Sequence, residues 1–240
     1  MLPELITFLK IFTPYLLGGV FVCIYIGEHI YPQQKELTYF RHDALNMLIG
    51  LVNMALVFTG GFYFQQFITF VNARHFGLLQ LFGLPALPGL VAGFLLIDCF
   101  LYWWHRFNHT IPFFWWFHRY HHKDKKMNST TAVRFHTGEL VLSYLIKLMV
   151  FPLLGISVGA VLLHSLVLFP VIVFHHSNLK INGKKDWLLR HLIVTPRMHR
   201  VHHSNVKFDT DSNYSSVLPL WDRLFSTYHK PGNGPVQFGI

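Results

Sequence analysis

The chain has 240 residues, of which 52% are hydrophobic and only 13% are charged. Soluble domains carry about 25% charged residues, so this composition excludes an ordinary soluble protein and indicates an integral membrane protein. The formal net charge of +9 does not call for a nucleic-acid partner, because membrane proteins concentrate Lys and Arg in cytoplasmic segments. The length suits one compact unit rather than two domains.

Three apolar stretches fill the first part of the chain, at about residues 5–30, 44–70 and 84–104. Each supplies the ~20 residues that a helix needs to cross ~30 Å of hydrocarbon, so we expect three transmembrane helices. The N-terminus lacks a basic region followed by a small-residue cleavage site. We therefore expect the first stretch to be a retained span rather than a cleaved signal peptide.

A polar segment rich in histidine follows, over residues 105–139. Its two motifs, HRFNH and HRYHH, contain five histidines: His105, His109, His118, His121 and His122. On a helix, residues at i, i+3 and i+4 share one face, so each motif directs its imidazoles the same way, as a metal site requires.

The fourth apolar stretch, residues 140–174, is 35 residues long. One helix of that length would measure ~52 Å, which is too long for an ordinary span. Pro152 and Gly155 can interrupt it near the middle. We therefore predict a helical hairpin, which returns the chain to the side of the membrane where the earlier histidines lie.

The last segment, residues 175–240, is polar and repeats the histidine motif as HRVHH, with His199, His202 and His203. The three motifs offer eight imidazoles, whereas a zinc site takes four ligands, so the number of donors indicates two metal ions. Neutral imidazole suits iron, zinc, copper and nickel, and the motifs contain no thiolate that would favour copper(I) or an iron–sulfur cluster.

The remaining isolated histidines are interpreted as packing or hydrogen-bonding residues: His29, His42, His75, His164, His191 and His229. For the motifs, the competing interpretation is a basic, solvated face at the membrane surface. Two copies of His-x-x-His-His beside His-x-x-x-His disfavour that interpretation.

The distribution of positive charge predicts the orientation in the membrane. Fifteen of the 20 Lys and Arg residues lie within 106–134 and 180–230, on the histidine side of the predicted spans. Positive loops face the cytoplasm, so the histidines should too. The sequence thus predicts an all-α, multi-pass integral membrane protein with about four hydrophobic segments. The last segment is a helical hairpin, and a cytoplasmic helical cap carries the histidine clusters.

Three blocks around the motifs resemble the fatty acid hydroxylase/sterol desaturase superfamily of membrane di-iron enzymes. The blocks are DCFLYWWHRFNH at 98–109, WFHRYHHKDKKMNSTTAVRFHTGE at 116–139 and TPRMHRVHHSNVKFDTDSNYSSVLPLWDRLFSTY at 195–228. The N-terminal third of the chain resembles the superfamily only in its hydrophobic character. These blocks are specific for the superfamily and poorly specific for the substrate.

The resemblance implies ten metal-ligating histidines: His105, His109, His118, His121, His122, His136, His176, His199, His202 and His203. His175 is a weaker candidate beside His176. The resemblance also implies one domain over 1–240, made of transmembrane helices in 1–104, histidine-rich cytoplasmic segments at 105–139 and 175–240, and the membrane hairpin at 140–174.

Metal-bound histidines usually donate their second ring N–H to a carboxylate or a carbonyl. Six polar residues stand at matching positions for this role: Asp98, Asn128, Glu139, Asn178, Asp211 and Asp222. Each could instead serve as a cap, a turn residue or an ion-pair partner, so both interpretations stay open.

By the same resemblance we expect two iron ions, O2 as co-substrate and hydroxylation of a fatty acyl, sterol or related lipid. Desaturation uses the same kind of site and remains an alternative. Electrons would come from a separate donor, such as a b-type cytochrome, ferredoxin or reductase, at a bacterial inner membrane or the endoplasmic reticulum. Two rival functions are a zinc-dependent membrane hydrolase with Glu139 as general base and a metal transporter.

Overall fold

The computed structural model describes residues 2–35, 40–232 and 234–240, and the regular elements in these residues are helices. They run in the order α1 (Leu2–Ile30), α2 (Phe40–Asn72), α3 (Leu78–Leu81), α4 (Ala86–Thr110), α5 (Pro112–His122), the 3₁₀ helix η2 (Ser129–Val133), α6 (Thr137–Leu154), α7 (Val158–His176), α8 (Gly183–Leu189), α9 (Pro196–His202), α10 (Lys207–Thr210) and α11 (Leu220–Leu224). The predicted all-α class is confirmed.

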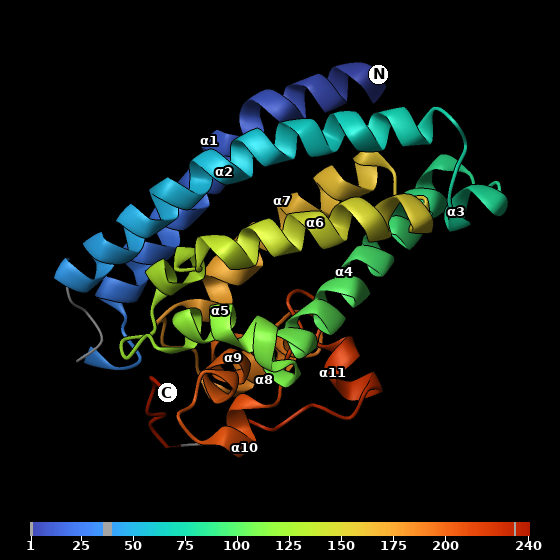
Figure 1. The fold of residues 1–240 in the computed structure, drawn as a ribbon. Helices are drawn as coiled ribbons and strands as arrows, with labels where there is room; N and C mark the ends of the chain where they lie inside the picture. Colours follow the sequence, from blue (N-terminus) through green and yellow to red (C-terminus); the bar gives the residue numbers. More distant parts are fainter. Residues whose placement is uncertain (1, 36–39, 233) are drawn as a thin grey trace.

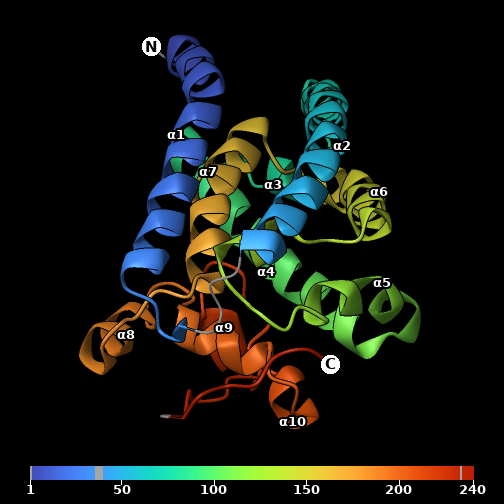
Figure 2. The same cartoon turned by 90° about the vertical axis from the view of Figure 1, so that its left-hand side faces the viewer.

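Five of the described helices, α1, α2, α4, α6 and α7, are long and apolar enough to cross a membrane. They form one end of the molecule, while α5 and α8–α11 gather at the other end with the C-terminus (Figures 1 and 2). Large apolar side chains such as Phe58, Leu51, Leu145 and Met149 are exposed on these helices, as expected for surfaces that contact lipid. The predicted all-α membrane architecture is confirmed.

The fourth apolar stretch forms the predicted hairpin of α6 and α7. Gly155 ends α6 in the left-handed conformation, with φ of 71°, and the Ile156 N–H donates to the Phe151 carbonyl at 3.0 Å. Ser157 then caps α7 by accepting from the Ala160 N–H at 3.1 Å. Glycine suits this position because it lacks the Cβ that opposes a left-handed backbone. Pro152 lies within the last turn of α6, so Gly155 rather than Pro152 makes the break.

The turn of the hairpin is held by the last residue of α2 and by the segment that follows that helix. The Asn72 amide donates to the Ile156 carbonyl at 3.1 Å. Gly77, with φ of 109°, approaches the turn so closely that a Cβ there would lie 2.3 Å from the Pro152 carbonyl oxygen and 2.4 Å from the Gly155 nitrogen. These contacts therefore anchor the turn between α6 and α7, which lies at the end of the hairpin away from the histidines.

Close contact between α4 and α7 fixes the inner pair of membrane helices. A Cβ on Gly93 would lie 2.7 Å from the Cβ of Ala160, so the two backbones approach at small residues, as is common between membrane helices. Beside this contact lies the apolar core of the membrane region: Phe64, Ile68, Ile97, Phe151, Ile156 and Ala160. This packing sets the position of the C-terminal end of α4 relative to that of α7.

Helix α4 runs further than the apolar stretch that predicts it. The expected span ends at Trp104, but the helix continues to Thr110, and Pro112 then starts α5 as its first residue. The 25 residues of α4 amount to ~37 Å, more than the hydrocarbon thickness. The last two turns therefore carry His105 and His109 beyond the apolar layer toward the cap.

Candidate metal centre

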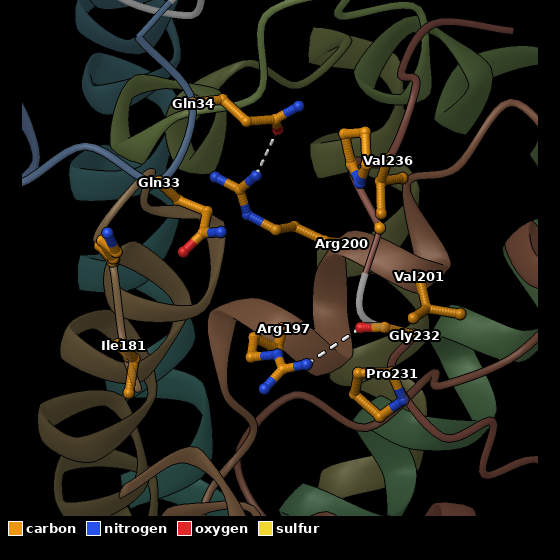
Figure 3. A pocket seen from close by; sticks show the side chains of 12 residues that line it. Gln33, Gln34, Ile181, Arg197, Arg200, Val201, Pro231, Gly232 and Val236 are labelled. Atoms are coloured by element: carbon orange, nitrogen blue, oxygen red, sulfur yellow. Dashed lines mark hydrogen bonds between the residues drawn. The ribbon is translucent and has the colours of Figure 1, made fainter. Parts of the chain in front are cut away.

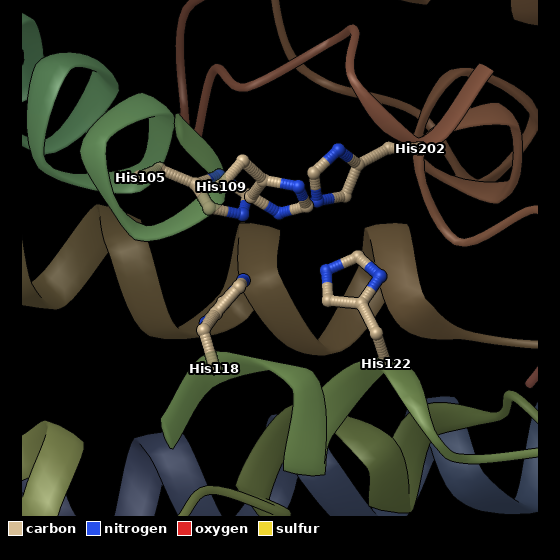
Figure 4. A group of neighbouring side chains, drawn as sticks. All are labelled: His105, His109, His118, His122 and His202. Carbon is tan, nitrogen blue, oxygen red and sulfur yellow. The ribbon is translucent and has the colours of Figure 1, made fainter. Parts of the chain in front are cut away.

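Nine buried or half-buried histidines form two groups at the junction of the membrane helices and the cap. In each group, one ring nitrogen per residue lies within 4.8 Å of the corresponding nitrogens of the others. The first group is His105, His109, His118, His122 and His202, whose rings converge from three chain segments in Figure 4. The second group is His121, His176, His199 and His203.

His105 and His109 of the first motif both serve the first group, whereas each of the two His-x-x-His-His motifs divides its residues between the groups instead of directing all its imidazoles to one. In α5, His118 and His122 stand one turn apart and serve the first group, while His121 faces the second. At the end of α9, His202 serves the first group and its neighbour His203 serves the second. The repeated His-x-x-His-His spacing therefore lets one short helix contribute to both groups at once.

The groups lie directly against each other. The His122 and His203 rings are stacked at 4.3 Å with an angle of 10° between their planes, and His202 and His199 stack at 5.0 Å. In each pair, one ring belongs to the first group and the other to the second. The two candidate sites thus form one continuous cluster of imidazoles.

Backbone carbonyl oxygens accept hydrogen bonds from the Nδ1 atoms of four of these histidines. The donor–acceptor pairs are His105 to Tyr214 at 2.7 Å, His121 to Arg134 at 3.1 Å, His176 to Ile172 at 2.8 Å and His202 to Ser212 at 2.7 Å. A carbonyl oxygen can only accept, so each Nδ1 carries the proton and each Nε2 carries a free lone pair. This tautomer leaves Nε2 as the metal-binding atom.

The spacing of these nitrogens suits a bound cation. The Nε2 atom of His176 lies 3.1 Å from Nε2 of His121 and 3.1 Å from Nε2 of His199. Two nitrogens held about 2.1 Å from one ion at 90–109° stand about 3.0–3.4 Å apart. Because His121 and His176 both carry their proton on Nδ1, their facing lone pairs repel each other unless a cation lies between them.

Many imidazole nitrogens in the groups have no hydrogen-bond partner within the described residues: His109 Nδ1 and Nε2, His118 Nε2, His122 Nδ1 and Nε2, His199 Nδ1, His202 Nε2, and His203 Nδ1 and Nε2. A buried polar atom left without a partner costs about 1–3 kcal/mol. So many in one place indicate that the cluster is built for ligation, and the residues present fit two metal ions.

Five histidines of the cluster are held in the neutral form by their surroundings. Burial, followed by the neighbouring imidazoles, lowers the pKa well below its usual value for the histidines of the cap: His121, His122, His199, His202 and His203. A neutral ring is the form that binds a metal ion. The environment thus favours ligation at neutral pH.

Two of the six expected polar partners lie beside a histidine of the groups. Glu139 Oε1 accepts from His118 Nδ1 at 2.8 Å, and both side chains are buried. Asp211 Oδ1 lies 3.5 Å from Nδ1 of His109. Glu139 belongs to the first turn of α6, so the hairpin contributes to the first group through its carboxylate.

Asp98 does not contact His105, although the two residues stand two helical turns apart. Its carboxylate lies 3.3 Å from His164 Nε2 in α7, and it accepts from the Trp221 indole at 2.8 Å and the Leu218 N–H at 3.0 Å. The carboxylate points across to α7 and the cap because those groups supply its donors. Asp98 therefore fastens α4 to α7 and α11, and His164 has the hydrogen-bonding role expected of it.

Asn128, Asn178 and Asp222 likewise lie outside direct contact with the groups. Asn128 caps η2 and donates to Asp43 at 2.7 Å, and Asn178 accepts from Arg200 at 2.7 Å. Asp222 accepts from the Tyr214 N–H at 2.7 Å and thereby holds the segment whose carbonyl binds His105. Asp222 acts on the cluster through one intervening residue.

His136 is not part of either group. Its ring lies among Phe117, Trp116 and Tyr120, and its Nδ1 accepts from the Gly138 N–H at 3.0 Å as the N-cap of α6. A nitrogen used as a helix cap is not available to a metal ion. His175 is also outside the groups, with its ring against His199 at 4.0 Å.

Sequence reasoning missed the carbonyl partners and the Tyr214 ring at the cluster, whereas Trp115 is one of the aromatic residues that flank the motifs in the sequence. Tyr214 lies 5.3 Å from the His109 ring and 5.7 Å from the His202 ring, and Trp115 lies 5.0 Å from His109. Carbonyl acceptors leave no trace in the sequence, because every residue has one. These aromatic rings help to close the cluster against water.

Comparison with known proteins adds an independent observation. Residues 90–227, more than half of the chain, match the sequence profile of the fatty acid hydroxylase family. The chain belongs to the fatty acid hydroxylase family. The matched region of this family member includes every histidine of the two groups.

Curated relatives of this fatty acid hydroxylase family member include alkylglycerol monooxygenases. The Xenopus tropicalis protein is 33% identical over 148 residues, which are 61% of this chain and 32% of that protein. The Homo sapiens protein is 30% identical over 149 residues, or 62% of this chain and 32% of that protein. The ornithine lipid hydroxylase OlsE of Rhizobium tropici is 45% identical over 40 residues, 17% of this chain and 12% of that protein.

The alignments span about a third of the length of the alkylglycerol monooxygenases. No solved structure matches this chain.

Proposed function

We propose that the chain is an O2-dependent lipid hydroxylase that binds two iron ions. The observation that carries this proposal is the pair of adjacent imidazole groups with inward-facing, unpartnered nitrogens. One ion would be held by His105, His109, His118, His122 and His202, and the other by His121, His176, His199 and His203. All of residues 1–240 would act as one domain, since both groups draw on membrane helices and cap alike.

Hydroxylation consumes a C–H bond, O2, two electrons and two protons, and yields an alcohol and water. The bound iron ions would supply O2 activation and removal of hydrogen from the unactivated C–H bond. The chain's own residues orient and protect that chemistry. The carbonyls of Tyr214, Arg134, Ile172 and Ser212 fix the histidine tautomers, and Glu139 orients His118.

A lipid substrate is supported by the position of the groups at the ends of α4 and α7. A lipid chain held between membrane helices would reach this level without entering water, and the burial of the site would exclude bulk solvent from the reaction. The printed names of the relatives, alkylglycerol monooxygenase and ornithine lipid hydroxylase, favour oxygen insertion over desaturation.

The site would face the cytoplasm, where a separate redox protein or reductant supplies the electrons. The cap contains most of the Lys and Arg residues of the chain, which supports this orientation by the positive-inside rule. We assign the protein to a bacterial inner membrane or to the endoplasmic reticulum.

Metal analysis combined with lipid mass spectrometry tests this proposal. We expect purified protein to contain two irons per chain, and cells that express it to contain a lipid heavier by one oxygen, only when O2 is present. Cells expressing a His121→Ala variant serve as the matched control. A lipid lighter by two hydrogens would show that the chain is a desaturase and not a hydroxylase. One tightly held zinc with activity independent of O2 would refute the oxygenase and favour a hydrolase, and metal flux without lipid change would favour a transporter.

A further inference from the structure

A second concave site lies on α9, on the face opposite the histidine groups. This pocket has a volume of about 440 Å³, within the range of small-ligand sites. Helix α9 directs His199 and His202 to the metal groups, while Arg197, Arg200 and Val201 line the pocket. The pocket is thus separate from the candidate metal centre although both share one helix.

Four chain segments build the pocket, and two of them directly follow membrane helices. Gln33 and Gln34 come shortly after α1, and Lys180 comes shortly after α7. An isolated β-bridge between Pro32 and Leu179 joins these two segments. Because α1 and α7 are membrane spans, the pocket lies near the level at which both helices leave the membrane.

Arg200 brings a buried positive charge to this pocket. Its side chain extends from α9 across the pocket to Gln34 (Figure 3), and only 5% of the residue is exposed. Its two terminal nitrogens donate to neutral amides, Gln34 Oε1 at 2.6 Å and Asn178 Oδ1 at 2.7 Å. Its Nε has no partner within the described residues.

Glu28, the carboxylate whose charge acts on this guanidinium, makes its hydrogen bonds to other groups. Glu28 accepts from the N–H groups of Asn178 and Ser129 at 2.7 and 3.0 Å, so it acts on Arg200 at a distance and not through a direct ion pair. The buried charge of Arg200 is therefore only partly balanced within the described residues.

Other cations surround the pocket, and no carboxylate lines it in the described part of the chain. Lys180 and Arg197 join Arg200 in the lining, with Arg197 donating to the Gly232 carbonyl at 3.0 Å. A neighbouring recess of about 570 Å³ shares Arg197 and Pro231 with the pocket and adds Lys184 and Lys230, together with Arg190, which is paired with Asp186 at 3.5 Å. Such an array attracts anions and strengthens their binding.

We propose that this pocket binds a phosphate-type oxyanion, either the phosphoryl headgroup of a membrane lipid or a free phosphate ester. Arg197, Arg200 and Lys180 supply the charge-assisted donors, and Gln33 and Gln34 supply neutral ones. Basic pockets where helices leave the membrane are suited to lipid phosphates. Binding here requires neither metal nor turnover.

Native mass spectrometry of the full-length protein in non-ionic detergent tests this inference. The probes are dioctanoyl phosphatidic acid, glycerol 3-phosphate and inorganic phosphate, with dioctanoylglycerol as the neutral control. The Lys180→Gln/Arg197→Gln double variant removes two cations from the rim and leaves the buried Arg200 in place. Lys207 in α10 is exposed and lines none of the described pockets, so Lys207→Gln serves as the control for loss of a surface cation outside the pocket.

We expect at least one phosphate-bearing probe to bind, and the double variant to bind it about tenfold more weakly, while Lys207→Gln binds like the unmodified chain. Binding of phosphatidic acid alone identifies a lipid headgroup, and comparable binding of glycerol 3-phosphate identifies a free ester. The inference is overturned if no phosphate-bearing probe binds, if the double variant binds equally well, or if dioctanoylglycerol competes as effectively as phosphatidic acid. None of these results depends on hydroxylase activity.

Discussion

Glu139 Oε1 and His118 Nδ1 lie 2.8 Å apart, and this bond joins the first turn of α6 to the metal-facing side of α5. The carboxylate fixes His118 with its proton on Nδ1 and its Nε2 lone pair directed into the first histidine group. The membrane hairpin thereby contributes to the orientation of a ligand without supplying a ligand at that point.

Replacement of Glu139 should weaken metal binding without removing a ligand. We expect Glu139→Gln, which keeps an acceptor but loses the charge, to lower the affinity of the first group for iron about tenfold, and Glu139→Ala to lower it up to about 100-fold. Titration of iron into protein that a chelator has freed of metal measures these affinities. Asp209→Asn, which removes a half-buried carboxylate next to His229, should leave the affinity unchanged. Equal affinities for all three variants would contradict the orienting role.

Single histidine substitutions should separate the two groups. His202→Ala removes a ligand from the first group only and His176→Ala from the second only, so each should lower the iron content from two ions toward one per chain. Elemental analysis of purified variants measures this content. The matched control is His191→Ala, because His191 is exposed and its ring interacts with the Trp187 carbonyl.

The His136→Ala variant tests whether His136 binds metal, as its sequence motif implies, or lies outside the metal centre, as its position in the structure indicates. Because His136 Nδ1 caps α6 and the ring lies outside both groups, we expect the variant to keep two irons and to lose about 1 kcal/mol of stability through the missing cap. Thermal unfolding in detergent and elemental analysis measure the two effects. Loss of one iron with unchanged stability would show that His136 is a metal ligand after all.

Metal-free protein should lose stability as the pH falls below about 6.5. The unfolded chain protonates its histidines near that pH, whereas burial and neighbouring imidazoles lower the pKa of the five cap histidines well below it. Between the folded and unfolded values the unfolded state binds more protons, so each such group reduces stability by up to about 1.4 kcal/mol per pH unit as the pH falls.

Melting temperatures measured from pH 8 to pH 5, with and without a chelator, test this dependence. Bound iron competes with protons for the same nitrogens, so the metal-loaded protein should keep its stability to a lower pH than the chelated protein. Identical pH profiles for the two forms would contradict the prediction.

Gly77→Ala should destabilise the hairpin by about 1–3 kcal/mol, because the new Cβ would meet the Pro152 oxygen and the Gly155 nitrogen at a left-handed backbone position. Gly83→Ala is the matched control, since Gly83 also has a positive φ, of 55°, but no atom lies within 4 Å of the added Cβ. Thermal unfolding should show a larger loss for Gly77→Ala. Equal losses would show that backbone conformation alone, and not contact with the turn, makes glycine necessary.

The sequence by itself determined the class of protein, the membrane spans and eight of the nine grouped histidines. These features depend on local properties: the length of an apolar stretch must match the membrane, and the i, i+3, i+4 spacing places side chains on one helical face. The hairpin also followed from local properties, since 35 apolar residues with Gly155 inside them exceed one span.

Only the tertiary structure decided how the histidines divide and what holds them. The motif at 118–122 gives no sign that His121 turns to a different group from His118 and His122, because that division depends on where α7 and α9 lie. Asp98 has the spacing to support His105, yet its donors lie on α7 and α11. Carbonyl acceptors, cap contacts and the basic pocket on α9 arise from segments distant in the chain, and local sequence patterns do not record such contacts.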